Sequence, residues 1–225
     1  MLLKDFIEKS IGTDYPVFDV DALALEVLEA MEKGQYDSLP VLKEGKLLAV
    51  VTLQDLLQAR HLDDNEALPL RELPLSKQPG IFLEDHLLDV FQRLRLLPGN
   101  LVPLSGREGE YLGCVRKIVF YEKIAEIFRL EDDGMTIELD LPSIGLKLSE
   151  VVAIIEKNDA TVVSFGMYHA PEMVAAFRVQ THDFFRLVTN LEKYGYSIRF
   201  SSPFLQEKDE SLREKALEFI RFMDM

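Results

Sequence analysis

The stretch that decides the fold is Leu39-Pro40-Val41-Leu42, followed by Leu47-Leu48-Ala49-Val50-Val51-Thr52-Leu53-Gln54-Asp55. A Glu44-Gly45 turn signal separates the two parts, so the pattern predicts a short strand, a turn and a second strand. The phrase returns as Val102-Pro103-Leu104, followed by Tyr111-Leu112-Gly113-Cys114-Val115-Arg116-Lys117-Ile118-Val119. The chain therefore contains a duplicated unit.

The second copy keeps the apolar frame and loses two polar residues. Thr52 falls opposite Arg116 and Asp55 falls opposite Val119, an offset of 64 in both cases. Thr52 can cap the following helix, with Asp55 near its positive end. The asymmetry indicates a duplicated sensory module in which one half binds a small polar ligand and the other mainly supports it.

Apolar spacing predicts the same elements in both copies. Helical spacing over 22–33 and 87–97 precedes each pair of strands, and a further helix follows each pair. The polar stretch 63–79, which contains three prolines, reads as a linker. We expect two β-α-β-β-α units at 1–66 and 67–131, named the first and second repeats below.

The pattern changes after residue 134. Alternation over 136–141 predicts a strand, and the rest of 135–202 predicts a helix, two strands, a helix and a strand. This βαββαβ order is that of a ferredoxin-like unit, so the whole chain is expected to be α+β. Residues 203–225 contain an amphipathic helical pattern over 210–223, whose apolar side must be covered by this chain or by a second copy.

The composition excludes several classes of protein. A formal net charge of −14 and a pI near 4.8 argue against binding to nucleic acid or to anionic membranes. No segment approaches the roughly 20 apolar residues of a membrane span, and the N-terminus does not read as a signal peptide. The single cysteine, Cys114, lies in an apolar run and is expected to be a buried structural thiol. A cytoplasmic protein is the plain interpretation.

Residues 1–130 resemble a pair of cystathionine-beta-synthase-type (CBS) domains, on Leu39-Pro40-Val41 followed by Leu48-Ala49-Val50-Val51-Thr52-Leu53-Gln54-Asp55-Leu56. Residues 135–202 resemble an ACT domain, on element order and on Asp140-Leu141-Pro142-Ser143-Ile144-Gly145. The combination is similar to the acetoin-utilisation regulator family of bacteria, whose members are usually sensors rather than catalysts. One departure is Ala49, where the CBS family often has glycine.

The resemblance implies a site for an adenosine-containing ligand such as AMP, ADP or ATP, and because Val119 cannot hold a ribose diol in the second copy, we expect one site per chain at most. Asp55 would accept hydrogen bonds from the ribose hydroxyls, and Thr52 would donate to a phosphate. The apolar walls of the adenine slot are expected to be Val17, Leu39 and Pro40. Tyr36 and Ser38 are expected to line the ribose-phosphate side. Arg116 would reach the phosphate from the second repeat. The alternative for Thr52 and Asp55 is a helix cap that needs no ligand.

The ACT-like resemblance points to the loop 142–147, for which we favour dimerisation or docking over an amino-acid site. Homodimers are expected, with an unknown target protein as a further partner. The four histidines lack zinc-site spacing, and nothing assembles a nucleophile with a base, so we expect no metal and no enzyme activity. The leading hypothesis is a nucleotide sensor that relays binding through the ACT-like domain or a dimer; the alternative is a ligand-free structural adapter.

Overall fold

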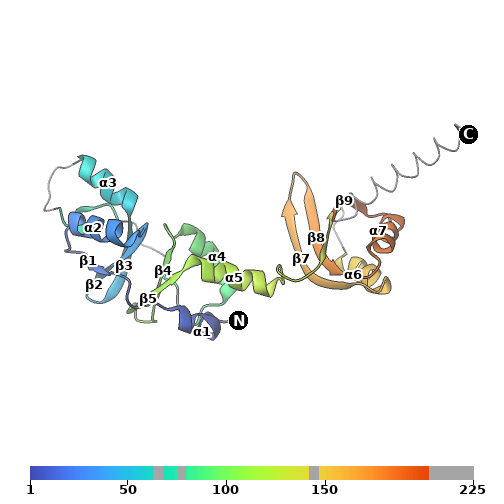
Figure 1. Cartoon of the computed structure of the whole chain (residues 1–225), viewed down its shortest axis with the longest axis horizontal. Helices are drawn as coiled ribbons and strands as arrows, with labels where there is room; N and C mark the ends of the chain where they lie inside the picture. The colour runs from blue at the N-terminus through green and yellow to red at the C-terminus, as the bar shows by residue number, and fades with distance from the viewer. Residues whose placement is uncertain (63–67, 76–79, 142–146, 203–225) are drawn as a thin grey trace, which may run out of the picture. The chain divides into compact units, whose positions relative to one another are not determined.

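The computed structural model describes residues 1–62, 68–75, 80–141 and 147–202 (Figure 1). The chain divides into two compact units, Met1–Lys123 and Ile124–Met225, named here the N-terminal unit and the C-terminal unit. The predicted helix over 210–223 lies outside the described residues. The same holds for 142–146 of the predicted ligand or docking loop.

The first repeat forms a three-stranded sheet with two helices. Strand β1 pairs in parallel with β2, and β2 pairs antiparallel with β3. Glu44 and Gly45 both have positive φ, as the predicted turn between β2 and β3 requires. The elements are β1 (Phe18–Asp19), α2 (Ala24–Gly34), β2 (Ser38–Lys43), β3 (Lys46–Thr52) and α3 (Leu53–Leu62).

The second repeat has the same order of elements, which confirms the predicted duplication. An isolated parallel bridge between Phe82 and Ser105 stands where the first repeat has β1. The elements are α4 (Leu87–Leu96), β4 (Leu101–Ser105), β5 (Tyr111–Arg116) and α5 (Lys117–Ile127), with β4 and β5 antiparallel.

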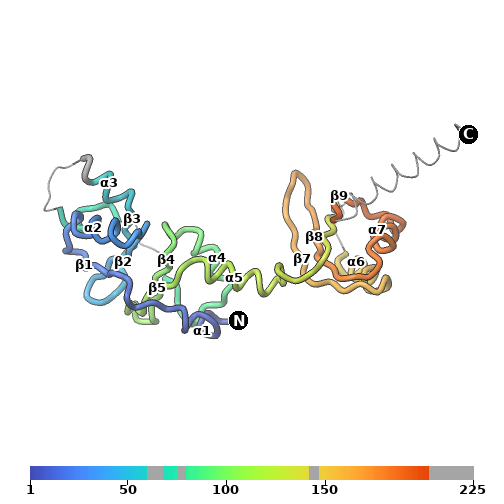
Figure 2. Tube along the Cα trace, viewed as in Figure 1, coloured from blue at the N-terminus to red at the C-terminus, as the bar shows by residue number. Residues whose placement is uncertain are grey.

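The first residues of each repeat, named here its leading segment, pack on the other repeat. The first segment holds α1 (Lys4–Ile7) and the 3-10 helix η1 (Glu8–Ser10), and then runs beside β5, where Gly12 and Cys114 exchange two backbone hydrogen bonds (Figure 2). The second segment holds the 3-10 helix η2 (Leu70–Glu72), and its Leu70 is fully buried in the first repeat. Each leading segment therefore completes the partner repeat.

One hydrophobic core extends across both repeats. Leu101 and Cys114 come from the second repeat, yet they pack in the cluster that fills the first. This burial of apolar surface is what holds the repeats together. The cluster contains Val27, Leu28, Met31, Leu39, Val41, Ala49, Val51, Leu56, Ala59, Leu70, Leu73, Leu101 and Cys114.

The C-terminal unit is a four-stranded antiparallel sheet with strand order β7-β8-β6-β9. With one helix between its first two strands and one between its last two, this is the ferredoxin-like topology that the sequence predicts. The elements are β6 (Met135–Asp140), α6 (Leu148–Lys157), β7 (Thr161–His169), β8 (Met173–Gln180), α7 (Phe184–Lys193) and β9 (Ser197–Ser201).

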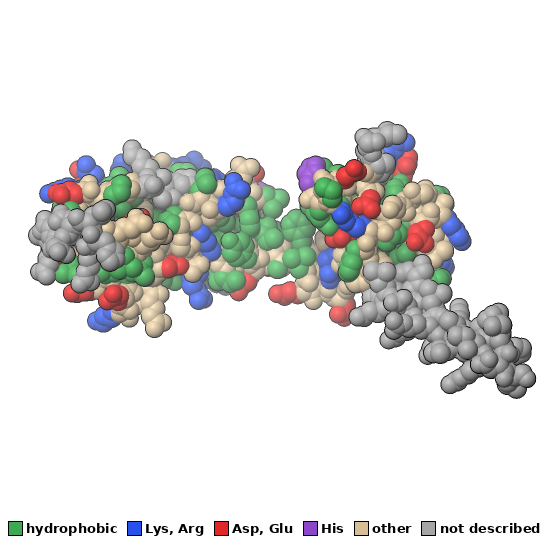
Figure 3. All heavy atoms as spheres, turned by 90° about the horizontal axis from the view of Figure 1, so that it is seen from above, with side chains coloured by type: hydrophobic (Ala, Val, Ile, Leu, Met, Phe, Trp, Pro, Cys, Tyr) green, Lys and Arg blue, Asp and Glu red, His purple; other side chains and the backbone are tan. Residues whose placement is uncertain are grey.

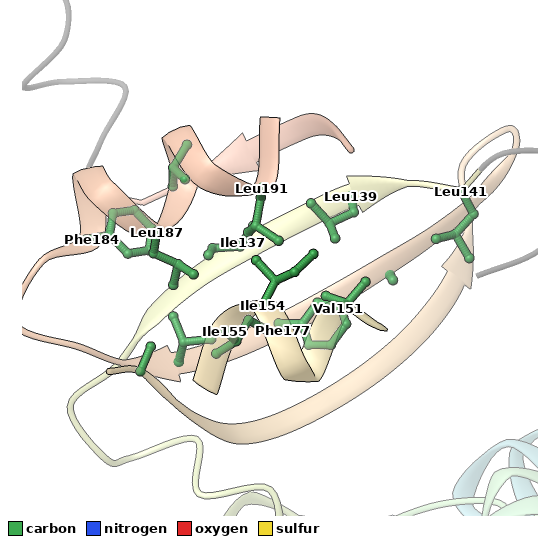
Figure 4. Close-up of a cluster of buried hydrophobic side chains, with 14 residues drawn as sticks. Ile137, Leu139, Leu141, Val151, Ile154, Ile155, Phe177, Phe184, Leu187 and Leu191 are labelled. Carbon is green, nitrogen blue, oxygen red and sulfur yellow. The ribbon is translucent and has the colours of Figure 1, made fainter. Parts of the chain in front are cut away.

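Both helices of the C-terminal unit cover one face of its sheet (Figure 4). Alternation along β6 places Ile137 and Leu139 in this core and leaves Glu138 on the other face. Helix α7 contributes Leu187 and Leu191, both fully buried. On the face of the molecule that Figure 3 presents, acidic and basic side chains are interspersed over the described surface.

Candidate functional site

Thr52 and Asp55 form a reciprocal cap where β3 ends and α3 begins. The Oδ2 atom of Asp55 accepts the backbone N–H of Thr52 at 2.8 Å and the Thr52 hydroxyl at 2.7 Å. The backbone N–H of Asp55 donates in turn to Thr52 Oγ1 at 3.1 Å. This is the geometry of a capping box, with aspartate in the place of the usual glutamate.

The cap leaves part of the Asp55 carboxylate available. Asp55 is half-buried, and its Oδ1 atom accepts no hydrogen bond from the residues that the structure describes. An ionised carboxylate offers acceptor sites on both oxygens, so Oδ1 can accept a ligand hydroxyl without loss of the cap. The arrangement serves a helix start by itself and is also compatible with ligand binding.

Several polar groups at the start of α3 already have partners within the chain. The N–H of Leu53 already donates to the backbone oxygen of Asp37 at 3.1 Å. The N–H groups of Thr52 and Asp55 are bonded within the cap, and the Thr52 hydroxyl is spent on the carboxylate. A phosphate contact from this hydroxyl would therefore require the Thr52–Asp55 bond to break.

Three predicted residues follow one another on β2. Ser38 is the register partner of Thr52, which places the two residues side by side across the strands. Its hydroxyl is fully buried and donates to Asp37 Oδ1 at 3.0 Å. Leu39 has no exposed surface and packs in the core, and Pro40 is buried beside it.

Val17 and Tyr36 lie at the edges of the same repeat. Val17, directly ahead of β1, is 41% exposed. Tyr36 is half-buried, and its ring packs edge-on against Tyr15 with centroids 6.1 Å apart. Of the predicted apolar walls, Val17 is therefore the one that presents most surface to solvent.

Arg116 ends β5 in the second repeat, where it pairs with Leu101. Its side chain is exposed, and among the described residues it makes no ion pair. It occupies the position that Thr52 has in the first repeat. The structure thus brings Thr52, Asp55 and Ser38 together and leaves Arg116 on the other repeat.

A contact between the repeats was missed at the level of sequence. Asp37 Oδ1 accepts the backbone N–H of Asn100 at 3.1 Å. Gly99, with φ of 65°, lies so close that a Cβ there would be 2.5 Å from the Cβ of Ser38. The signal was present, since Asp37 and Asn100 each stand three residues before the proline of their copy.

Lys117 lies beside this contact. Its ammonium donates to the backbone oxygen of Leu97 at 2.6 Å, at the end of α4. Burial lowers the pKa of Lys117, and the negative charge of Asp37 opposes that change. The junction between repeats therefore holds one carboxylate and one partly desolvated ammonium.

Cys114 is a buried thiol, as its apolar surroundings predict. Desolvation raises its pKa to about 11, although a hydrogen bond with the Tyr111 hydroxyl at 3.3 Å opposes the rise. The thiol stays protonated at neutral pH, which is the inert form of a cysteine. Within the described ranges, no group of three or more His, Cys, Asp or Glu side chains could hold a metal ion.

The C-terminal unit has a hollow of about 450 Å³ at the start of β6. Its lining includes Asp133, Gln180 and His182, none of which was predicted to bind a ligand. The amide of Gln180 donates to the backbone oxygen of Asp133 at 2.8 Å. The loop 142–147 follows the opposite end of β6, so the hollow and the predicted loop are distinct features.

The family comparison identifies the first repeat. Residues 4–62 match the model of the CBS domain. No curated protein gives a significant match. Among the described residues, the structure has no helix with the length and apolar character of a membrane span.

Several solved structures with CBS domain pairs are similar to the chain. A CBS domain pair/ACT domain protein from Thermotoga maritima is 23% identical, with a TM-score of 0.47, over 56% of this chain and 98% of its own. CBSX2 from Arabidopsis thaliana is 17% identical, with a TM-score of 0.48, over 57% and 96%. CBSX2 in complex with AMP is 17% identical, with a TM-score of 0.45, over 56% and 97%.

Proposed function

We propose that this protein is a regulatory sensor that binds an adenine nucleotide, AMP, ADP or ATP, between its two repeats. The observation that carries the proposal is the Thr52–Asp55 cap, which lies within the CBS domain and leaves Asp55 Oδ1 as an acceptor. One carboxylate oxygen stabilises the helix while the other accepts a ribose hydroxyl.

The second repeat holds no equivalent acceptor, because Val119 stands where the first has Asp55. The proposal is therefore one nucleotide per chain. The exposed Arg116 supplies the positive charge for the phosphate, since the Thr52 hydroxyl already donates to Asp55. Val17 provides exposed surface for the adenine, with the buried Leu39 and Pro40 beneath that wall, and the half-buried Tyr36 and the buried Ser38 stand on the ribose-phosphate side.

The proposal extends to the C-terminal unit, which we take to be an ACT-like domain that relays nucleotide binding to a homodimer partner or a target protein. The ferredoxin-like topology and the order of the two units support this part, as does the sequence resemblance to acetoin-utilisation regulators. The protein would act in the cytoplasm as a regulator and not as an enzyme.

The test is calorimetric titration and thermal unfolding of the full chain with AMP, ADP and ATP. We expect binding near one nucleotide per chain, with a rise in Tm, and loss of both in Asp55→Ala. Asp183→Ala is the matched control, because Asp183 caps α7 by accepting the N–H of Arg186 at 2.9 Å, far along the chain from the proposed site. A stoichiometry near two, or unchanged binding in Asp55→Ala, would contradict the proposal.

A structural adapter is the second candidate, and one observation favours it. The cap gives the Thr52 hydroxyl and Asp55 Oδ2 their partners without any ligand, and Leu39 is closed within the core. An adapter would show neither heat nor a Tm shift with any of the three nucleotides, whereas its oligomeric state in light scattering would depend on the CBS pair.

A further inference from the structure

The start of α3 and the second repeat are joined through a single residue. The backbone oxygen of Asp37 accepts the N–H of Leu53, the first residue of α3, at 3.1 Å. The side chain of Asp37 accepts the N–H of Asn100, ahead of β4, at 3.1 Å. One residue therefore contacts the first repeat through its backbone and the second repeat through its carboxylate.

Further hydrogen bonds extend from the neighbours of Asp37 into both repeats. On the first repeat, Leu53 directly follows Thr52, whose hydroxyl and N–H bond the Asp55 carboxylate. On the second repeat, the backbone oxygen of Asn100 accepts the N–H of Lys117, the first residue of α5, at 2.8 Å. Hydrogen bonds thus connect the starts of α3 and α5.

Packing keeps the junction from moving freely. Gly99 leaves no room for a Cβ against Ser38, and the fully buried Ser38 hydroxyl donates to the same Asp37 oxygen that Asn100 uses. The buried Ser38 and the close approach of Gly99 therefore hold the exposed Asp37 against the loop around Asn100.

We propose that Asp37 couples the nucleotide site to the second repeat, so that occupancy at Asp55 changes the stability of the start of α5. The inference rests on the proposed function. A nucleotide that bonds Asp55 favours one position of the start of α3, and Asp37 transmits that preference because it is bonded to both repeats. Asp37 is a positioning residue and does not contact the ligand.

The two bonds of Asp37 can be separated by substitution. Asp37→Ala removes the carboxylate contact with Asn100 and keeps the backbone contact with Leu53. Asp37→Asn keeps an Oδ1 acceptor for Asn100 and is the matched control. If Asp37 served stability alone, Asp37→Ala would change the Tm, but AMP would still slow amide exchange in the second repeat.

The experiment measures amide hydrogen exchange of Leu53, Asn100 and Lys117 by NMR in the full chain, with and without AMP. In the wild type and in Asp37→Asn, AMP should slow exchange of Lys117 by about fivefold, the lower range of typical coupling. In Asp37→Ala, AMP should still raise the Tm and slow Leu53, but Lys117 should no longer respond. A Lys117 response that persists in Asp37→Ala would overturn the inference and leave the proposed function standing.

A second exchange experiment tests the same coupling without a ligand. Asp55→Ala breaks the cap, and it should speed exchange of Lys117 in the wild-type background but have no further effect in the Asp37→Ala background. If AMP fails to raise the Tm of the wild type, the proposed function fails and this arm decides the coupling alone. Equal effects of Asp55→Ala in both backgrounds would show that Asp37 carries no coupling.

Discussion

Asp37 and Asn100 occupy equivalent positions in the two repeats and bond to one another, with Asp37 Oδ1 accepting the Asn100 N–H at 3.1 Å. Their backbone oxygens also play the same part, since each accepts the N–H of the first residue of the following helix, Leu53 at 3.1 Å and Lys117 at 2.8 Å. The duplicated backbones thus keep a common geometry at their junction. The two sides of the junction differ in one respect, because the Asp37 side chain accepts a hydrogen bond from the backbone of the other repeat.

Gly99→Ala should destabilise the N-terminal unit strongly. Gly99 has φ of 65°, and an added Cβ would overlap the buried Ser38 side chain. Gly45→Ala is the matched control, because Gly45 also has positive φ, 76°, with nothing within 4 Å of an added Cβ. The control should lose about 1 kcal/mol, and Gly99→Ala about 2–4 kcal/mol, measured by urea unfolding. Equal losses would show that the contact with Ser38 costs nothing.

Gly113→Ala tests the attachment of the N-terminal segment. Gly113 has φ of 136°, and an added Cβ would lie 2.6 Å from Ile11 Cγ2 and 2.8 Å from the backbone oxygen of Gly12. We expect a loss of about 1–3 kcal/mol in the free energy of unfolding, with faster proteolytic cleavage around residue 12. Gly166→Ala is the control, since nothing lies within 4 Å of its added Cβ. Unchanged cleavage in Gly113→Ala would contradict the predicted clash.

Stability should fall with pH above about 8.5 because of Cys114. The pKa of an unfolded cysteine thiol is about 8.5, whereas burial raises the pKa of the folded thiol to about 11. Between these values the unfolded chain binds fewer protons, so the free energy of unfolding decreases as pH rises, by up to about 1.4 kcal/mol per pH unit. Cys114→Ala should show a flatter slope between pH 8.5 and pH 10 in chemical denaturation. The same slope in both proteins would assign the loss to other groups.

Leu187→Ala should destabilise the C-terminal unit without affecting nucleotide binding. Leu187 is fully buried between α7 and the sheet, so truncation should cost about 2–5 kcal/mol. Leu96→Ala, at a leucine that is 64% exposed, should change stability by about 0.5 kcal/mol or less. Calorimetry with AMP should give the wild-type affinity for both variants at temperatures below unfolding. A lost affinity in Leu187→Ala would mean that the site depends on the C-terminal core.

The sequence was sufficient to predict the structure where a residue's role depends on its neighbours along the chain. Alternation around Ile137 and Leu139 predicted β6, and the Leu39-Pro40-Val41 frame predicted β2. The order of elements in both units followed from such local patterns, so the α+β fold could be predicted.

The sequence was insufficient where a role depends on a distant partner. Pairing of Gly12 with Cys114 leaves no local signature. For the bond from Asn100 to Asp37, the equal spacing of the two residues from the prolines marks equivalent positions but does not show that they touch. The candidate site is ambiguous for a different reason. A threonine followed three residues later by an aspartate is the same pattern for a helix cap and for a nucleotide site, and the structure shows the cap at Thr52 and Asp55.

The crossed placement of the two leading segments has an evolutionary consequence. Leu70 fills the core of the repeat before it, and the stretch through Gly12 lines the edge strand of the repeat beyond it. A gene fragment that encoded the first repeat alone would lack the Leu70 that fills its core, and one that encoded the second alone would leave β5 without the stretch through Gly12. A stable transfer of this module from one gene to another would therefore have to carry both repeats together.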